Sequence, residues 1–225
     1  MTLYTCQYCK KGFKKETTLA VHVCEPKKRY QERDEAGPRL GLQAYLKFYE
    51  TTQGSAKPKT FDDFAASPYY SAFVKFGQYC VSIRAINPTQ FTLWLLKNNK
   101  KIDYWCKDAI YTEYLMDYLR VENVSDALAR AIEFSIDWAE KTDSPSHDCL
   151  RYGNTNAMCY AISTGRISPW VVYNSESGQK FLSELNTEQV ALIWPYINSD
   201  FWQKKFRDYP EDTEYAREIL KKAGW

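Results

Sequence analysis

Three cysteines and one histidine near the start of the chain, Cys6, Cys9, His22 and Cys24, have the residue types and the spacing of a metal site. Thiolate sulfur and imidazole nitrogen are the ligands of structural Zn²⁺ sites, which hold the ion in a tetrahedron of four ligands. Two residues separate Cys6 from Cys9, so a tight turn can direct both thiolates at one ion. The sequence therefore predicts a zinc site formed by these four side chains.

A small ββα unit must position these ligands. The order of residues is aromatic-x-Cys-x2-Cys-x3-Phe-x5-Leu-x2-His-x-Cys, in which Tyr4, Phe13 and Leu19 fill the apolar positions. Phe13 and Leu19 are too small a core to fold alone, so metal binding must drive folding. Up to His22 the pattern resembles the C2H2 zinc-finger family, which implies a ββα fold around bound zinc.

The fourth ligand departs from that family. Only Val23 separates His22 from Cys24, whereas the family leaves three to five residues between its last two ligands. Residues two apart on an α-helix point to nearly opposite sides. Cys24 can therefore bind only if the helix ends right after His22, an ending that Pro26 favours.

Basic residues are concentrated at the start of the chain, in a segment that we call the head (residues 1–33). The head holds eight basic and three acidic residues, a net charge of +5, whereas the remainder holds 22 basic and 25 acidic residues, a net charge of −3. This asymmetry favours a polyanion partner for the head. The side chains that we expect to contact nucleic acid are Lys10, Lys11, Lys14, Lys15, Thr18, Lys27, Lys28 and Arg29.

Base reading by this unit should be weak. If it enters a major groove as zinc fingers do, Lys15, Thr18 and Val21 face the bases. Lysine can donate to guanine, but threonine is ambiguous and valine offers only apolar contact. We expect weakly sequence-specific DNA binding through phosphates, with a steep dependence on salt. In the alternative, the lysines only keep the unit soluble, and the zinc site is a clip that folds the N-terminus.

The remainder of the chain favours an all-α domain. Apolar residues recur at helical spacing from Arg39 onward, and no alternating strand pattern occurs outside the finger. Capping signals for helix starts occur at Thr60 with Asp63, Ser67-Pro68, Asn87-Pro88, Ser125-Asp126 and Ser168-Pro169. The predicted fold class is mainly α, with a ββα zinc finger at residues 1–26, a charged linker at 27–38 and an all-α multi-helix domain at 39–225.

Several boundaries within that domain can be predicted. One helix should run from Asp103 through Arg120, and another from Asn156 to Thr164, where Gly165 ends it. Polar loops are expected at 51–58 and at 142–153. Pro195 should kink or end its helix.

Groups that could carry catalysis are sparse. His147 is the only other histidine, and adjacency in His147-Asp148-Cys149 does not make a nucleophile with its base. The chain has no Gly-rich phosphate loop. We therefore expect that it is not an enzyme. The cysteines outside the finger lack metal or disulfide spacing and should be reduced and mostly buried; they are Cys80, Cys106, Cys149 and Cys159.

Two segments mix aromatic and basic residues, residues 97–107 around Trp105 and residues 202–207. Stacking on aromatic rings together with phosphate neutralisation would hold a single strand of nucleic acid. The alternative, a buried tryptophan with a solvated lysine edge, is favoured for the first segment and stays open for the second.

The run FVKFGQYCVSIRAINPTQFTLWLLKNN, from Phe73 to Asn99, is followed by Trp105 and by residues 111–115. Its hydrophobic spacing resembles helical replication accessory proteins of tailed phages, of the helicase-loading type. The resemblance implies an all-helical protein that binds DNA and bridges a helicase to a single-strand-binding protein. No site residue can be inferred from this resemblance, because it depends on hydrophobic spacing and includes no specific sequence motif.

Taken together, these features predict a zinc-finger nucleic-acid-binding accessory protein that bridges DNA and replication proteins, a phage DNA replication factor of the helicase-loading type. The alternative is a protein-interaction or virion-assembly protein whose finger is a structural clip. The start of the chain is polar, and no apolar run approaches the ~20 residues that a membrane span needs. We therefore expect a soluble protein of the cytoplasm, or of the host cytoplasm if it is viral.

Overall fold

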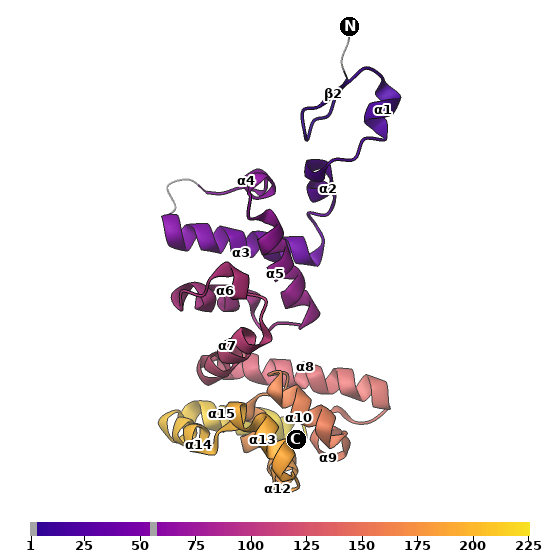
Figure 1. Cartoon of the computed structure of the whole chain (residues 1–225). Helices are drawn as coiled ribbons and strands as arrows, with labels where there is room; N and C mark the ends of the chain where they lie inside the picture. The colour runs from indigo at the N-terminus through magenta and orange to yellow at the C-terminus, as the bar shows by residue number, and fades with distance from the viewer. Residues whose placement is uncertain (1–3, 55–57) are drawn as a thin grey trace. The chain divides into compact units, whose positions relative to one another are not determined.

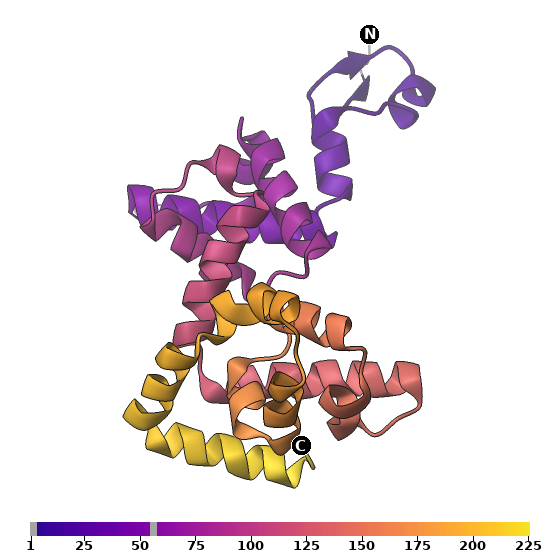
Figure 2. The same ribbon diagram turned by 60° about the horizontal axis from the view of Figure 1, so that its bottom comes forward.

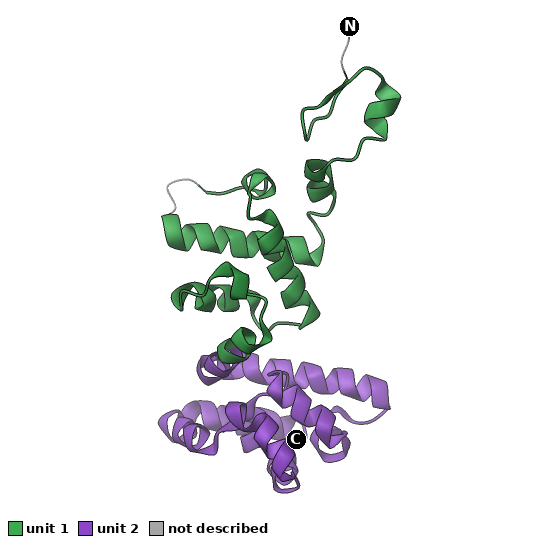
Figure 3. Ribbon diagram, viewed as in Figure 1, with its two compact units in different colours: residues 1–114 green, residues 115–225 purple. Residues whose placement is uncertain are grey.

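The computed structural model describes residues 4–54 and 58–225 (Figure 1). Contacts within the chain divide it into two compact units, Met1–Tyr114 and Leu115–Trp225 (Figure 3). The described residues contain one sheet, which has two strands and lies near the N-terminus. Helices form most of the rest, so the predicted mainly α fold class is confirmed. No described helix is both long enough and apolar enough to cross a bilayer.

Unit 1 begins with a two-stranded antiparallel ribbon, in which Tyr4 pairs with Phe13 and Thr5 with Gly12. Its elements are β1 (Tyr4–Thr5), β2 (Gly12–Phe13), α1 (Glu16–Ala20), α2 (Glu25–Gln31), α3 (Ala36–Gln53), α4 (Phe61–Ala66), α5 (Tyr70–Ser82), α6 (Pro88–Lys97), the 3-10 helix η1 (Ile102–Tyr104) and the first part of α7 (Asp108–Val121). The boundary between the units falls within α7.

Unit 2 is helical throughout. Its elements after α7 are α8 (Val124–Thr142), the 3-10 helix η2 (Ser146–Asp148), α9 (Cys149–Tyr152), α10 (Thr155–Ser163), α11 (Pro169–Asn174), α12 (Glu176–Ser183), α13 (Thr187–Ile197), α14 (Ser199–Asp208) and α15 (Pro210–Lys222). The C-terminal helix α15, yellow in Figure 2, packs against α8 and α11. One apolar cluster that includes Leu128, Trp170 and Ile193 forms the core.

Three predicted helix starts are found at the expected residues. Thr60 forms a complete capping box with Asp63, Asn87 caps α6, and Ser168 caps α11 ahead of Pro169. The prediction for α8 is wrong, because Asn123 and not Ser125 is its N-cap: the Asn123 side chain accepts from the Ser125 amide at 2.8 Å. Both residue types are good caps, and the earlier one prevails because α8 then buries Val124.

Ser67 also differs from its predicted role. Its hydroxyl accepts from the Tyr69 amide at 3.1 Å, which forms a turn, and α5 starts only after that turn. The Ser67-Pro68 pair therefore lies in the turn that precedes α5 and not in the first turn of the helix.

Some helix boundaries differ from the predicted ones. Helix α7 begins at Asp108, five residues after the predicted start, because residues 102–104 form η1 and the adjacent Trp105 is buried. The expected loop at 142–153 contains η2 and α9, which Cys149 and Leu150 anchor in the core. In the expected loop at 51–58, α3 continues to Gln53, and residues 55–57 lie outside the described residues.

The core of unit 1 depends on a close crossing of α3 and α5. A Cβ atom placed on Gly77 of α5 would lie 2.0 Å from the Gly37 carbonyl oxygen and 2.7 Å from the Gly41 amide nitrogen of α3. Only glycine allows the two backbones to approach so closely. Buried aromatic rings, among them Phe73 and Phe76, pack beside this crossing.

Residues 27–38, where we expected a charged linker, hold most of α2 and the first residues of α3. Gly37 and Pro38 at its end are buried. The division of the chain into finger, linker and all-α domain, with boundaries at residues 26 and 38, stays a prediction.

Candidate metal centre

Four side chains of the head converge on one point. The ligand atoms of Cys6, Cys9, His22 and Cys24 all lie within 4.8 Å of one another. Cys9 Sγ lies 3.3 Å from His22 Nε2, and Cys6 Sγ lies 4.0 Å from Cys24 Sγ. In a tetrahedral site with Zn–S of about 2.3 Å and Zn–N of about 2.0 Å, ligand atoms are about 3.5–3.8 Å apart. The four predicted residues are thus brought together at a spacing that suits one small metal ion such as zinc.

A tight turn between β1 and β2 positions the first two ligands. The Cys6 amide donates to the Lys11 carbonyl oxygen, and the Lys10 amide donates to the Cys6 carbonyl oxygen, both at 2.9 Å. Lys10 adopts a left-handed conformation with φ of 61°, which is uncommon for a residue other than glycine. These two hydrogen bonds fix the turn that contains Cys6 and Cys9, and both thiol groups lie near the side chains of His22 and Cys24.

The turn also favours the ionised form of Cys6. Backbone N–H groups, first that of Cys9 and then that of Tyr8, lower the pKa of Cys6 from 9.0 to about 7 against the opposing effect of burial. A thiolate that accepts such bonds is stabilised relative to the thiol, and the thiolate is the metal-binding form. Burial raises the pKa of Cys24. A bound cation would be needed to hold that sulfur as a thiolate.

The last two ligands lie beyond the helix. Helix α1 ends at Ala20, two residues before His22, so it ends ahead of Cys24 as required but earlier than the predicted end right after His22. The chain is irregular from His22 to Cys24. Pro26 has a different role from the predicted one, since it lies in the first turn of α2 and Cys24 is the N-cap of that helix. Pro26 therefore starts a second helix and does not end the first.

The finger has almost no apolar core of its own. Helix α1 contains no buried residue, and both Phe13 and Leu19 are only partly buried. The Phe13 ring packs on the ring of His22, with centroids 4.7 Å apart. Because so little apolar surface is removed from water, a metal ion bound by the four residues would supply most of the free energy that folds this segment.

Most of the side chains predicted to contact nucleic acid are exposed on the head. Lys11, Lys14, Lys15 and Thr18 are all exposed. Lys10 is also exposed and donates to the Gln7 carbonyl oxygen at 2.7 Å. Lys28 forms a solvent-exposed pair with Glu32 at 3.7 Å.

Two of the predicted basic residues make internal contacts instead. Lys27 Nζ donates to the His22 carbonyl oxygen at 3.1 Å. Arg29 Nη1 donates to the Ala65 carbonyl oxygen at 2.7 Å, and its guanidinium lies 4.3 Å from the centroid of the Tyr70 ring. The Arg29 side chain is only 20% exposed, so it is poorly placed to reach a phosphate.

An aromatic residue that the sequence analysis did not single out joins the head to the rest of unit 1. The Tyr30 hydroxyl donates to an Asp62 carboxylate oxygen. Its ring lies 5.2 Å from Tyr8 on the metal-binding turn and 5.0 Å from Phe61 on α4, between centroids. The only available signal in the sequence was one aromatic residue within an otherwise charged stretch.

The tryptophans of the two segments that mix aromatic and basic residues, 97–107 and 202–207, are not accessible for stacking with a base. Trp105 is 1% exposed and donates through Nε1 to the Lys100 carbonyl oxygen. Trp202 is also 1% exposed and donates to the Tyr196 carbonyl oxygen. Both belong to the core, which settles the question left open for the second segment.

The thiol in His147-Asp148-Cys149 is not placed to act as a nucleophile. Cys149 is fully buried, and burial raises its pKa to about 12. At neutral pH it is therefore a thiol and not the reactive thiolate. Cys80 and Cys159 are buried as predicted, whereas Cys106 is only partly buried.

Comparison with known protein families, with curated proteins and with solved structures finds no match to this chain. The interpretation of the metal centre therefore depends on its geometry and chemistry.

Proposed function

We propose that this protein is a zinc-dependent nucleic-acid-binding accessory protein. Zn²⁺ held by Cys6, Cys9, His22 and Cys24 folds the finger, and lysines exposed on the head bind DNA phosphates. The helical units engage protein partners. The observation that carries the proposal is the convergence of four soft ligand atoms within 4.8 Å, in a head whose net charge is +5.

The exposed side chains favour contacts to phosphate over contacts to bases. Helix α1 has five residues, about one and a half turns, so it presents little surface to a groove. Thr18 is exposed, and Val21, which is 78% exposed, offers only apolar contact. Lys11, Lys14 and Lys15 can each neutralise a phosphate without regard to sequence.

Fluorescence anisotropy with labelled duplex DNA at several salt concentrations tests this proposal. If three lysines release counterions, log K should fall with log[salt] at a slope of about −2.7. Joint replacement of Lys11, Lys14 and Lys15 by alanine should abolish most binding, whereas replacement of Lys221 and Lys222 on α15 serves as the control. The proposal fails if the zinc-loaded protein does not bind at low salt.

A second candidate is an interaction or virion-assembly protein in which the zinc site is a clip. The contacts of Arg29 and Tyr30 with α4 and α5 favour it, because they use head residues to build structure. This candidate gives no DNA binding at any salt concentration, although a chelator still unfolds the finger.

The replication role implied by the resemblance to phage helicase-loading proteins belongs to the first candidate. Its test is a binding assay with forked DNA and a purified replicative helicase. A bridging factor should bring the two into one complex, and the lysine variant should not.

A further inference from the structure

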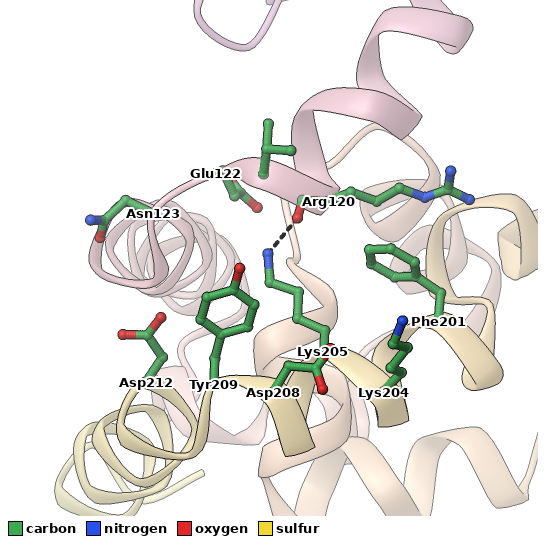
Figure 4. A pocket seen from close by; sticks show the side chains of 10 residues that line it. Arg120, Glu122, Asn123, Phe201, Lys204, Lys205, Asp208, Tyr209 and Asp212 are labelled. Atoms are coloured by element: carbon green, nitrogen blue, oxygen red, sulfur yellow. Dashed lines mark hydrogen bonds between the residues drawn. The ribbon is translucent and has the colours of Figure 1, made fainter.

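A second potential binding site lies in unit 2, apart from the metal centre. A cavity of about 550 Å³ is bounded by the end of α7, the start of α8, and the helices α14 and α15 (Figure 4). This volume lies within the range of about 300–1,000 Å³ that is typical of small-molecule sites. The zinc-finger proposal assigns no role to this cavity.

Lys205 provides a fixed positive charge in the middle of this cavity. Its Nζ donates to the Arg120 carbonyl oxygen (Figure 4). The same nitrogen lies 5.5 Å from the Trp170 ring, 5.4 Å from the Trp202 ring and 5.8 Å from the Tyr209 ring, to the centroids. Burial lowers its pKa, while nearby carboxylates oppose that effect. The ammonium group is thus held in place by the fold before any ligand binds.

The other charged side chains are only partly separated by sign, because Asp208 lies between Lys204 and Tyr209. In Figure 4 the Arg120 and Lys204 side chains lie on one side with Phe201, and Asp212 lies on the opposite side next to Tyr209. The Arg120 guanidinium packs on the Phe201 ring at 4.9 Å, which orients it. Lys204 is exposed, and within the described chain it has no hydrogen bond or ion pair. One wall therefore suits an anion and the other suits a hydrogen-bond donor.

Glu122 does not add to the acidic wall, because it already has a cationic partner. Its side chain is fully buried, with Oε1 accepting from Arg130 Nη2 at 2.9 Å and Oε2 lying 2.7 Å from Arg130 Nη1. The carboxylates that remain for a ligand are those of Asp208 and Asp212.

We propose that this cavity binds a nucleoside monophosphate whose base carries an exocyclic amine. The phosphate would lie at Arg120 and Lys204, the base would stack on the half-exposed Tyr209 ring, and the amine would donate to Asp212. A continuous nucleic-acid strand fits less well, because the carboxylates of Asp208 and Asp212 would repel its further phosphates.

Isothermal titration calorimetry on the full-length, zinc-loaded protein tests this assignment with three probes. AMP carries both the phosphate and the amine, IMP has a carbonyl oxygen in place of the amine, and adenosine lacks the phosphate. AMP should bind at least about tenfold more tightly than either, since each comparison removes one charge-assisted contact.

Two variants locate the site. Lys204→Ala should weaken AMP binding by about tenfold, and Asp212→Asn should abolish the preference for AMP over IMP. The matched controls are Lys221→Ala on α15 and Asp126→Asn on α8, which do not line the cavity; circular dichroism checks that each variant is folded.

Equal binding of AMP and adenosine, or an equal loss in the control variants, would overturn the assignment. The assignment would also be overturned if a short oligonucleotide displaced AMP when present at a lower concentration than AMP. That result would indicate a groove that binds a nucleic-acid strand. Because the zinc ligands are untouched in these variants, failure here leaves the zinc-finger proposal standing.

Discussion

Cys24 is the residue that distinguishes this metal centre from an ordinary finger. It can reach the other ligands only because the chain leaves α1 at Ala20 and becomes irregular before His22. The same residue is the N-cap of α2. One residue therefore joins the candidate metal centre, through its side chain, to the start of the helix that packs on the rest of unit 1.

Replacement of Cys24 by serine should therefore release the metal. We expect zinc affinity to fall by more than about a hundredfold, because loss of an outer-shell partner alone costs 10–100-fold. Zinc bound per chain, measured after dialysis against a weak chelator, checks the expectation. Cys106→Ser, at a partly buried cysteine far along the chain, is the control and should keep full stoichiometry.

Metal binding should weaken as pH falls. Protons compete with the ion for each ligand, and the pKa of Cys6 is lowered from 9.0 to about 7. For a group with a lowered pKa, the stabilising contribution is complete above the ordinary value and is lost as pH falls toward the folded value. In the folded finger, the Cys6 thiolate is thus fully stabilising above pH 9, and protonation removes that contribution as pH falls through about 7, which weakens the binding of an ion.

Titration with Co²⁺, followed by its thiolate absorption from pH 8 to pH 6, measures this dependence. The apparent affinity should decrease steadily across the range. A constant affinity would show that fewer thiolates bind the ion than the geometry indicates.

Among the secondary-structure elements of unit 1, α3 and α5 cross with their backbones in close contact, which leaves no room for a side chain at Gly77. Gly77→Ala places a methyl group 2.0 Å from the Gly37 carbonyl oxygen, so the helices must separate. Overpacking of this kind costs about 1–3 kcal/mol or more. The higher helix propensity of alanine, about 1 kcal/mol, cannot compensate for that cost.

Urea denaturation of Gly77→Ala should show the loss as a lower midpoint. Lys75→Ala, at an exposed position of the same helix, should leave the midpoint nearly unchanged. A variant at residue 77 that is more stable than the parent would mean that α3 and α5 do not approach as closely as described.

Helix α2 is held to the rest of unit 1 by few but specific contacts. Arg29→Ala removes the bond to Ala65 and the packing on Tyr70. Hydrogen bonds from charged groups contribute about 1.5–3 kcal/mol, so α2 should detach at least about tenfold more often. A glutamate-specific protease should then cleave at residues 32–35 correspondingly faster. Lys28→Ala, which loses only an exposed ion pair, should be cleaved at the parent rate.

At the scale of the whole molecule, the metal should control the finger and leave the helical units intact. The cores of both units are built from buried aromatic and aliphatic side chains, and Phe13 and Leu19 are not among them. Treatment with a strong chelator should therefore expose the amides of residues 4–24 to hydrogen exchange while the helices from α3 onward stay protected. Protection of residues 4–24 without metal would contradict zinc-driven folding.

Local features were predictable because they depend on residues close in the chain. The candidate metal ligands span 19 residues, Cys6 to Cys24, and the capping residues act within one turn of their own helix. Side-chain burial also explains the errors. Nothing local to residues 103–107 shows that the long helix will start only at Asp108, and nothing local to Arg29 shows that the Ala65 carbonyl oxygen will accept its hydrogen bond.

The four candidate ligands, the basic head and the helical character of the chain could all be predicted from the sequence, since they follow from residue type, charge and periodicity. Three features became visible only in the packed fold: Arg29 and Tyr30 attach the head to α4 and α5, glycines set the crossing of α3 and α5, and Lys205 lies among three aromatic rings. These arrangements depend on contacts between residues far apart in the chain, such as Lys205 with Trp170 and with the Arg120 carbonyl oxygen, and their geometry exists only once the cores have packed.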